Sequence, residues 1–183
     1  MASQKQGLEA EGAGLEGKLP TAPYQWKVIA LDESNNRALA VTKDVVAKMP
    51  YHEPGGDITW ESCTLRQWLN NDFYKGLPAE IQPRVVEVAN KNPDNPAYGT
   101  PGGNDTKDRV FLLSIDEARR YFKSASERIA KFEGPGCWWW LRSPGDGADY
   151  AASVSYDGDV NDYGFDVIGD DGVGVRPALW LSL

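Results

Sequence analysis

The restricted set of residue types in residues 143–175 constrains the fold of this chain more than any other feature. The stretch contains no Lys, Glu, Gln, Met or Trp, although roughly four Lys and Glu would be expected in a segment of this length at average composition. Its charge is carried by Asp, with Tyr, Ser, Asn and Gly between the aspartates. Small apolar residues recur at Ala151, Ala152, Val154, Val160, Val167, Val173 and Val175. This alternation predicts half-buried strands with a fixed inner side and a diverse outer side.

The outer residues of this segment have the composition of a binding surface. Tyr offers a large contact area with few rotatable bonds, and Ser, Asn, Asp and Gly offer adaptable hydrogen bonds. Lys and Glu lose more side-chain entropy on immobilisation and are depleted at interfaces. The alternative is a loop-rich β region whose Asp and Gly only form turns. Turns do not account for the three tyrosines and one phenylalanine interleaved with them, so a binding surface is favoured.

Upstream, the sequence predicts two amphipathic helices. The first begins near Ser62 or Thr64 and spans about ten residues. Its apolar side is formed by Leu65, Trp68, Leu69 and Phe73. The second begins at Ser114, which forms a capping box with Glu117.

Strands are predicted around these helices. Residues 24–42 are typical of a β-hairpin, and residues 110–113 (VFLL) of a buried strand. Helices and strands do not alternate in βαβ order, so the expected fold class is α+β. At 183 residues, one domain over residues 23–183 is expected.

The first 22 residues mix Gly, Glu, Gln and Ala and lack an apolar run of signal-peptide length. Residues 1–22 therefore predict a flexible leader, or equally a linker left from a longer polypeptide. No run approaches the ~18 apolar residues of a membrane span, so a soluble protein without membrane insertion is expected. Its final location stays open, including display on a virion or a cell surface, and so does its oligomeric state.

Charge and side-chain inventory exclude several classes of function. Nineteen Lys and Arg against 27 Asp and Glu give a net charge of −8, and an acidic surface repels nucleic-acid phosphates and anionic lipids. With one histidine, His52, and two cysteines, the chain lacks a His-based triad, a multi-His metal centre and a four-thiolate zinc site. His52 itself is expected in a surface loop. We expect no nucleic-acid partner, no metal and no cofactor.

Three motifs in the last third resemble those of a known family. They are WWLRSPG at residues 139–145, the spaced core of Ala152, Val154, Asp157, Gly158 and Val160, and GVRPALWL at residues 174–181. Residues 59–70 and 106–118 add to the likeness. From about residue 24 onward, the chain resembles the variable proteins of diversity-generating retroelements. The resemblance implies a C-type-lectin-like fold of the formylglycine-generating-enzyme-like subgroup, with two helices and short, mostly antiparallel strands.

In such systems an RNA template is copied with errors at adenines. Randomised asparagine codons then yield residues such as Asn, Asp, Tyr, Ser, Gly and Phe, but never Lys, Glu, Gln, Met or Trp, which fits residues 143–175. The resemblance implies a non-catalytic protein that recognises a protein or cell-surface ligand, different for each variant. The implied variable, ligand-binding positions are Asp146, Gly147, Asp149, Tyr150, Ser153, Ser155, Tyr156, Asp159, Asn161, Asp162, Tyr163, Phe165, Asp166, Ile168, Asp170 and Asp171.

Two other functions remain as alternatives. Asp170 with Asp171, or Asp157 with Asp159, could supply oxygen ligands to the Ca²⁺ of a carbohydrate-binding lectin. The enzymes related to this fold oxidise a substrate cysteine with their own reactive cysteines. Here the two cysteines stand far apart in the sequence, and the inventory of nucleophiles is too small for catalysis to be expected.

The remaining conspicuous residues are assigned mainly to the framework. In a strand, Trp138 and Trp140 share one side and Trp139 the other, so at least one side is expected in the core, and one exposed Trp could contact a ligand. Arg142 and Arg176 are expected as buried anchors rather than ligand contacts. C-type lectins often link their ends by a disulfide, but free thiols are favoured for the two cysteines.

Overall fold

Two sheets form the framework of the chain, which the computed structural model describes over residues 23–169 and 172–183. The predicted leader, residues 1–22, lies outside the described residues. In spatial order, the four-stranded sheet consists of β1 (Trp26–Asp32), β2 (Arg37–Thr42), β13 (Ala178–Ser182) and β4 (Val85–Val86). The five-stranded sheet consists of β11 (Val160–Asp166), β10 (Tyr150–Val154), β9 (Trp139–Pro144), β12 (Gly174–Val175) and β3 (Ala47–Lys48). Two further ladders pair β5 (Val88–Asn90) with β6 (Thr106–Asp108), and β7 (Ala130–Lys131) with β8 (Gly136–Cys137).

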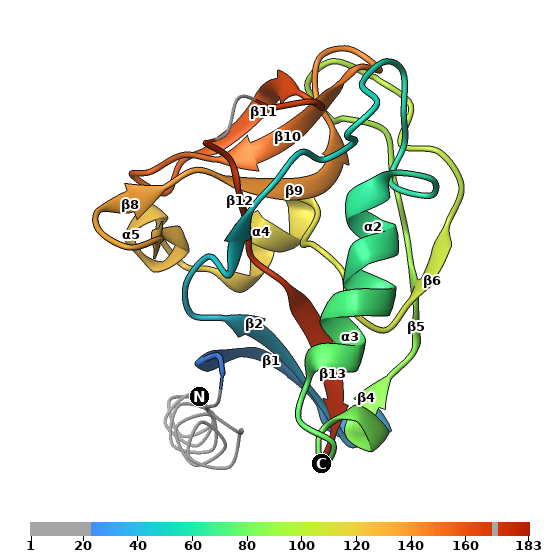
Figure 1. The fold of residues 1–183 in the computed structure, drawn as a ribbon, viewed down its shortest axis with the longest axis vertical. Helices are drawn as coiled ribbons and strands as arrows, with labels where there is room; N and C mark the ends of the chain where they lie inside the picture. The colour runs from blue at the N-terminus through green and yellow to red at the C-terminus, as the bar shows by residue number, and fades with distance from the viewer. Residues whose placement is uncertain (1–22, 170–171) are drawn as a thin grey trace, which may run out of the picture.

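The strand pairing bears out a mixed α and β architecture with mostly antiparallel strands. Within the described residues, β9 and β12 form the parallel pair, and the other named pairs are antiparallel. The predicted hairpin is confirmed, because β1 and β2 pair across the short 3-10 helix η1 (Glu33–Asn35). Strand β13, at the end of the chain, pairs with β2. The four-stranded sheet lies at one end of the molecule, and β9, β10 and β11 lie at the other (Figure 1).

The first predicted helix is confirmed as one continuous helical segment. It comprises α2 (Thr64–Trp68), the π-helical turn η2 (Leu69–Phe73) and α3 (Tyr74–Gly76). The expected apolar positions face the core: Leu65, Leu69 and Phe73 are buried and Trp68 is half-buried. The N-cap is Cys63, whose Sγ accepts a hydrogen bond from the backbone N–H of Arg66 at 3.4 Å.

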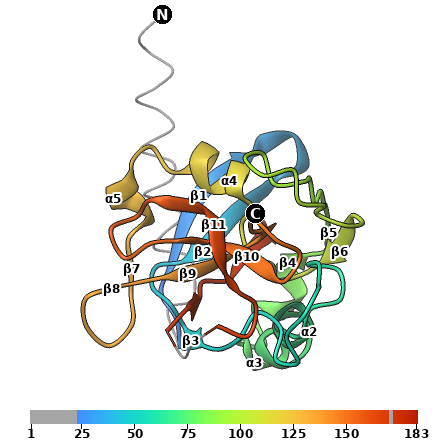
Figure 2. The same ribbon diagram turned by 90° about the horizontal axis from the view of Figure 1, so that it is seen from above.

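The second predicted helix is α4 (Ile115–Tyr121), and its capping box is confirmed. The Ser114 hydroxyl accepts from the Glu117 N–H at 3.2 Å, and the Glu117 carboxylate accepts from the Ser114 N–H at 2.9 Å. Two short helical pieces accompany it, α5 (Ala125–Arg128) and the 3-10 helix η3 (Gln82–Arg84). Helices α4 and α5 lie on the opposite side of the strands from α2 and α3 (Figure 2).

Residues 110–113 are buried, as expected, but they do not form a strand. The segment makes a single β-bridge, between Phe111 and Ala178 of β13. Its four side chains are at most 1% exposed, so it runs through the core beside β13, and the Asn70 side chain of η2 bonds the backbone of Val110. The apolar run predicted burial correctly because burial and strand pairing impose the same composition on a short segment. Among the described residues, no helix is long and apolar enough to cross a membrane.

Arg142 anchors β9 from within the core, as expected. Its side chain is 3% exposed, pairs with the Glu117 carboxylate and donates to the Asn92 amide oxygen at 3.1 Å. It also donates to the carbonyls of Leu112 and Lys91 at 2.8 and 3.0 Å. The planar guanidinium thereby joins β9 to α4 and to the loop that precedes β6.

Arg176 is the second buried anchor. It donates to the backbone carbonyls of Thr42, Lys43 and Arg128 at 2.9 to 3.1 Å and lies over the ring of Trp139. Burial lowers its pKa to about 10. Both arginines are therefore fully used by the framework.

The cysteines are free thiols, both buried. Burial raises the pKa of Cys63 to about 12, and burial also raises the pKa of Cys137. His52, expected in a surface loop, is half-buried, and its Nδ1 accepts from the Thr64 N–H at 3.4 Å.

Candidate ligand-binding face

The small apolar residues of the C-terminal third form the inner side of the candidate site. Six of the seven expected anchors are buried in the core, and Val160 is half-buried against it. The buried positions are Ala151, Ala152, Val154, Val167, Val173 and Val175. The alternation of the sequence therefore predicted the inner side of this region.

A bulge in β11 shapes the outer side. Ala151 pairs with Phe165, and Ser153 pairs with Asn161. Between these two pairs β11 advances by four residues while β10 advances by only two. The three residues between Asn161 and Phe165 therefore fall outside the regular ladder, and Gly164 among them lies close to Ala151 of β10. The edge strand thus presents more side chains than a regular strand of the same span.

Gly164 and Tyr163 show the consequence of the bulge. Gly164 has φ +79°, and a Cβ there would lie 2.1 Å from the Ala151 carbonyl oxygen. Glycine adopts this left-handed conformation without strain. The preceding residue, Tyr163, projects outward and is 50% exposed.

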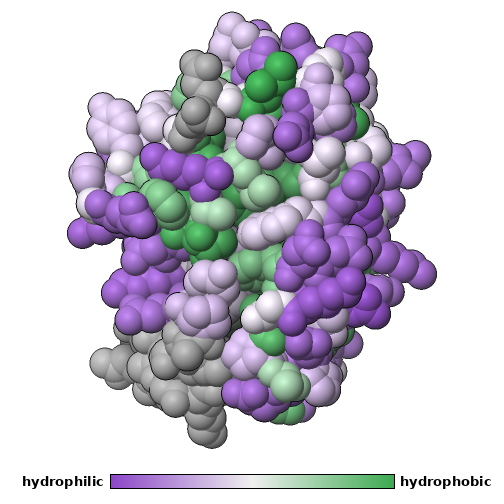
Figure 3. Space-filling view, viewed as in Figure 1, coloured by the Kyte–Doolittle hydropathy of each residue, from purple (hydrophilic) through white to green (hydrophobic). Residues whose placement is uncertain are grey.

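Twelve of the sixteen predicted variable positions are exposed or half-buried. They are Asp146, Gly147, Asp149, Tyr150, Tyr156, Asp159, Asn161, Asp162, Tyr163, Phe165, Asp166 and Ile168. Asp170 and Asp171 lie outside the described residues. We call the twelve accessible positions the outer face. At the end of the molecule where β10 and β11 lie, hydrophobic and hydrophilic side chains alternate over short distances (Figure 3).

The expectation that Ser153 and Ser155 belong to this face is wrong. Ser153 is fully buried, as are Ala152 and Val154 beside it, so both sides of β10 are covered at this point. Ser155 is 6% exposed, and its hydroxyl stabilises the following turn. That hydroxyl accepts from the Asp159 N–H at 2.9 Å and donates to the Asp157 carboxylate. Neither serine is available to a ligand in this conformation.

Aromatic rings form two groups, each of which joins rings of the outer face to one neighbouring ring. In the first, Tyr163 packs edge-to-face against Tyr98, at a centroid distance of 6.2 Å, and against Tyr150, at 5.6 Å. In the second, Trp138 packs edge-to-face against Phe165 at 4.9 Å and Tyr156 at 6.1 Å. Exposed aromatic rings of this kind carry much of the energy at binding surfaces.

The three consecutive tryptophans divide between core and surface. Trp139 and Trp140 are fully buried, so both sides of β9 are covered here, where at least one buried side was expected. Trp138 is half-buried and lies beside the outer face, where its ring packs against Phe165 and Tyr156. Sequence reasoning missed Tyr98, which is 52% exposed. The available signal was a lone tyrosine in a Gly- and Pro-rich loop, but the sequence does not show which strand that loop contacts.

The loop that carries Tyr98 is fastened to the outer face by Asn95. Its buried Nδ2 donates to the carbonyls of Pro144, Gly145 and Asp162 at 2.8 to 3.1 Å. Its Oδ1 accepts from the backbone N–H of Tyr98 at 3.2 Å. This amide holds the loop against β9 and β11, and thereby positions Tyr98 beside Tyr163.

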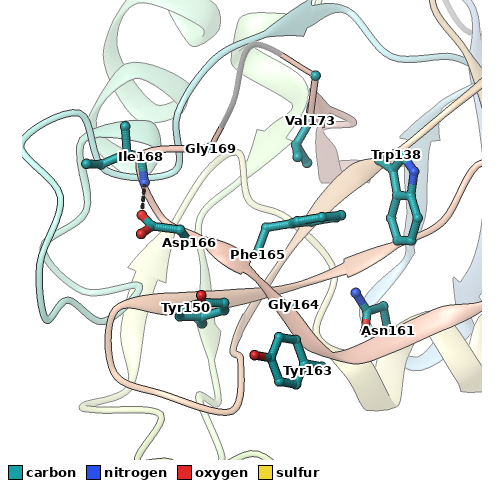
Figure 4. A pocket seen from close by; sticks show the side chains of 11 residues that line it. Trp138, Tyr150, Asn161, Tyr163, Gly164, Phe165, Asp166, Ile168, Gly169 and Val173 are labelled. Atoms are coloured by element: carbon teal, nitrogen blue, oxygen red, sulfur yellow. Dashed lines mark hydrogen bonds between the residues drawn. The ribbon is translucent and has the colours of Figure 1, made fainter.

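Between the aromatic groups lies an open depression of about 930 Å³. Gly164 lies between its two sides: Phe165 and Trp138 lie on one side, and Tyr150 and Tyr163 on the other (Figure 4). Asp166 and Ile168 also line it. A second depression of about 390 Å³ is lined by Tyr156, Asp157 and Asp159. Trp138 and Asn161 line both depressions, so the two are adjacent.

The surroundings of Tyr150 are electronegative. Its pKa is raised by the neighbouring Tyr163 phenol, by burial, and by the carboxylates of Asp166, Asp149 and Asp146. The three carboxylates are the acidic groups among these causes, and their charge disfavours a further negative charge at this place. The depression therefore combines aromatic walls with a negative potential.

Asp162 and Asp157 are already occupied by protein groups. Both oxygens of Asp162 accept from Arg119 Nη2, at 2.9 and 2.7 Å. The hydrogen bond from the Ser155 hydroxyl lowers the pKa of Asp157. Among the described residues, no group of three or more His, Cys, Asp or Glu side chains is placed to hold a metal ion. The alternative pair Asp170 and Asp171 lies outside them.

Comparison with known proteins adds a family but no activity. The family model described as a domain of unknown function (DUF6273) matches residues 35–183. No curated protein and no solved structure matches the chain.

Proposed function

Since the chain belongs to the DUF6273 family, whose description assigns no activity, we propose a function from the outer face itself. The protein is a non-catalytic binding module that recognises a protein or cell-surface target through the outer face. Retroelement-directed mutagenesis of adenines diversifies that face, so each variant has its own target.

The observation that carries this proposal is the separation of two residue sets along one segment. Six of the seven interleaved Ala and Val anchors are buried, whereas twelve positions drawn from the restricted set of residue types are accessible. Adenine mutagenesis produces that set of types, and a protein tolerates such diversification where side chains do not pack in the core. A turn-rich region of ordinary origin would not need to exclude Lys and Glu from its accessible positions.

The fold we propose is C-type-lectin-like, of the subgroup related to formylglycine-generating enzymes. Two observations support it. The mostly antiparallel strands accompany two main helical segments, and the pairing of β2 with β13 closes the domain at its ends. The motif segments at residues 139–145 and 174–181 include the buried anchors Arg142 and Arg176.

The thiols support a binding role over the oxidation chemistry of related enzymes. A reactive cysteine is one whose pKa is lowered, so that the thiolate is present near neutral pH. Here burial raises the pKa of both Cys63 and Cys137. We therefore assign both thiols to packing.

A display library tests the proposal. The twelve positions of the outer face are randomised to the residues that adenine mutagenesis allows, and the library is selected against three unrelated purified proteins. A matched control library randomises the six buried anchor positions in the same way. Specific binders should come from the first library and not from the second. Failure of the face library, with its members folded, would contradict the proposed function.

The gene's surroundings give an independent test. The expected finding is a reverse-transcriptase gene beside a near-copy of the segment that encodes residues 143–175, differing only at adenines. A near-copy that differs at other bases would contradict the mutagenesis mechanism but not the binding role.

A further inference from the structure

The depression between the two aromatic groups has the features of a subsite for a cation. On one side, Tyr150 and Tyr163 pack edge-to-face at 5.6 Å. On the other, Phe165 and Trp138 pack in the same way at 4.9 Å. The faces of aromatic rings attract cations through their quadrupole. Two pairs of rings therefore line a space of about 930 Å³.

A carboxylate with free hydrogen-bonding capacity stands at the rim of this space. Asp166 lies opposite Tyr150 in the strand register. Its Oδ1 accepts from the Ile168 N–H at 2.9 Å, which fixes the side chain (Figure 4). Its Oδ2 accepts no hydrogen bond from the described residues. The carboxylate is thus oriented by the backbone while one oxygen stays available.

No described residue supplies a cation to this carboxylate. The segment of residues 143–175 contains no Lys or Arg. Arg142 and Arg176, which flank it, are buried and bonded to framework groups. The exposed Arg119 pairs with Asp162. The negative potential created by Asp146, Asp149 and Asp166 is therefore available to a positively charged partner.

We propose that the depression binds an arginine side chain of the target protein, with its guanidinium stacked on the tyrosine pair and paired with Asp166. This inference rests on the proposed binding function and specifies the chemistry of the ligand.

Arginine fits these walls better than lysine does. Its guanidinium is planar, so it stacks on an aromatic ring while its edge donates two hydrogen bonds to a carboxylate. An ammonium group is more strongly hydrated and has no flat surface to stack. A neutral polyol would leave the negative potential uncompensated.

The direct test is a titration with single blocked amino acids. The full chain, labelled with ¹⁵N, is titrated with N-acetyl-arginine methylamide and, separately, with its neutral isostere N-acetyl-citrulline methylamide. The arginine probe should shift the amide signals of residues 164–168, and the citrulline probe should bind at least about tenfold more weakly. Methyl glucoside serves as a polyol probe and is expected to leave these signals unchanged.

Two variants locate the interaction. Asp166→Asn keeps the oxygen that accepts from Ile168 but removes the charge, and it should weaken arginine binding about tenfold. Asp72→Asn removes the same charge at an exposed site on η2 and should leave the affinity unchanged. Equal binding of citrulline, equal effects of the two variants, or shifts caused by the glucoside alone would each overturn the inference. If the arginine probe fails while the face library still yields binders, the ligand chemistry is wrong and the proposed function stands.

Discussion

Arg142 offers a quantitative test of the framework beneath the outer face. Replacing it by Ala removes a guanidinium that is 3% exposed, and leaves the Glu117 carboxylate and the carbonyls of Leu112 and Lys91 without this donor. Removing one partner of a buried ion pair typically costs about 3–5 kcal/mol. For a chain of this size each kcal/mol lowers the melting temperature by about 2–4 °C. Arg142→Ala should therefore lower it by roughly 6–20 °C.

Arg119 provides the matched control. It also binds both oxygens of a carboxylate, that of Asp162, but its side chain is 46% exposed. Exposed ion pairs contribute less than about 1 kcal/mol, so Arg119→Ala should lower the melting temperature by no more than about 4 °C. Differential scanning calorimetry and urea unfolding measure both variants. Equal losses of unfolding free energy in the two variants would refute the assignment of Arg142 as a buried anchor. So would a loss below about 1 kcal/mol for Arg142→Ala.

Three further predictions concern single side chains. Gly158→Ala should lower the free energy of unfolding, measured in urea, by more than about 2 kcal/mol. Gly158 has φ +90°, and the new Cβ would lie 1.9 Å from the Ala125 carbonyl oxygen. An unchanged free energy of unfolding would contradict this geometry. Ser153→Ala should leave stability unchanged or raise it by up to about 1 kcal/mol, because the buried hydroxyl has no partner among the described residues; a clear loss would show that the hydroxyl is bonded. Cys63 has a folded pKa of about 12 against an ordinary value of 9.0, so its contribution to stability is full below pH 9 and is lost as the pH rises toward 12. Between pH 8 and pH 11, the free energy of unfolding should therefore fall less for Cys63→Ala than for the unmodified chain. Identical pH dependence of the two free energies would refute the raised pKa of Cys63.

The sequence predicted the inner framework better than the outer face. The period of Leu65, Leu69 and Phe73, the Ser114 capping box and the small apolar residues of β10 all follow from local rules of helix and strand geometry. Residues 110–113 were correctly assigned to the core and wrongly to a strand, because local composition reports burial and not the hydrogen-bond partner.

The errors at the site arise from contacts between distant segments. Strand alternation was taken to leave one side of β10 in solvent, so Ser153 was placed outside, although both sides of this strand are buried. The approach of Tyr98 to Tyr163 depends on the hydrogen bonds of Asn95 to β9 and β11. Such tertiary contacts leave no periodic signal in the sequence.

A complete substitution scan of the C-terminal third tests the separation of framework and outer face most directly. Every residue of the described segments 143–169 and 172–175 is replaced by all others, and protease resistance reports the folded fraction of each variant. Resistance should persist at the twelve outer-face positions and fall at the six buried anchors, most steeply at the five that are fully buried, Ala151, Ala152, Val154, Val167 and Val175. A scan in which substitutions at Tyr150, Tyr163 and Asp166 unfold the protein as often as those at the anchors would contradict the account.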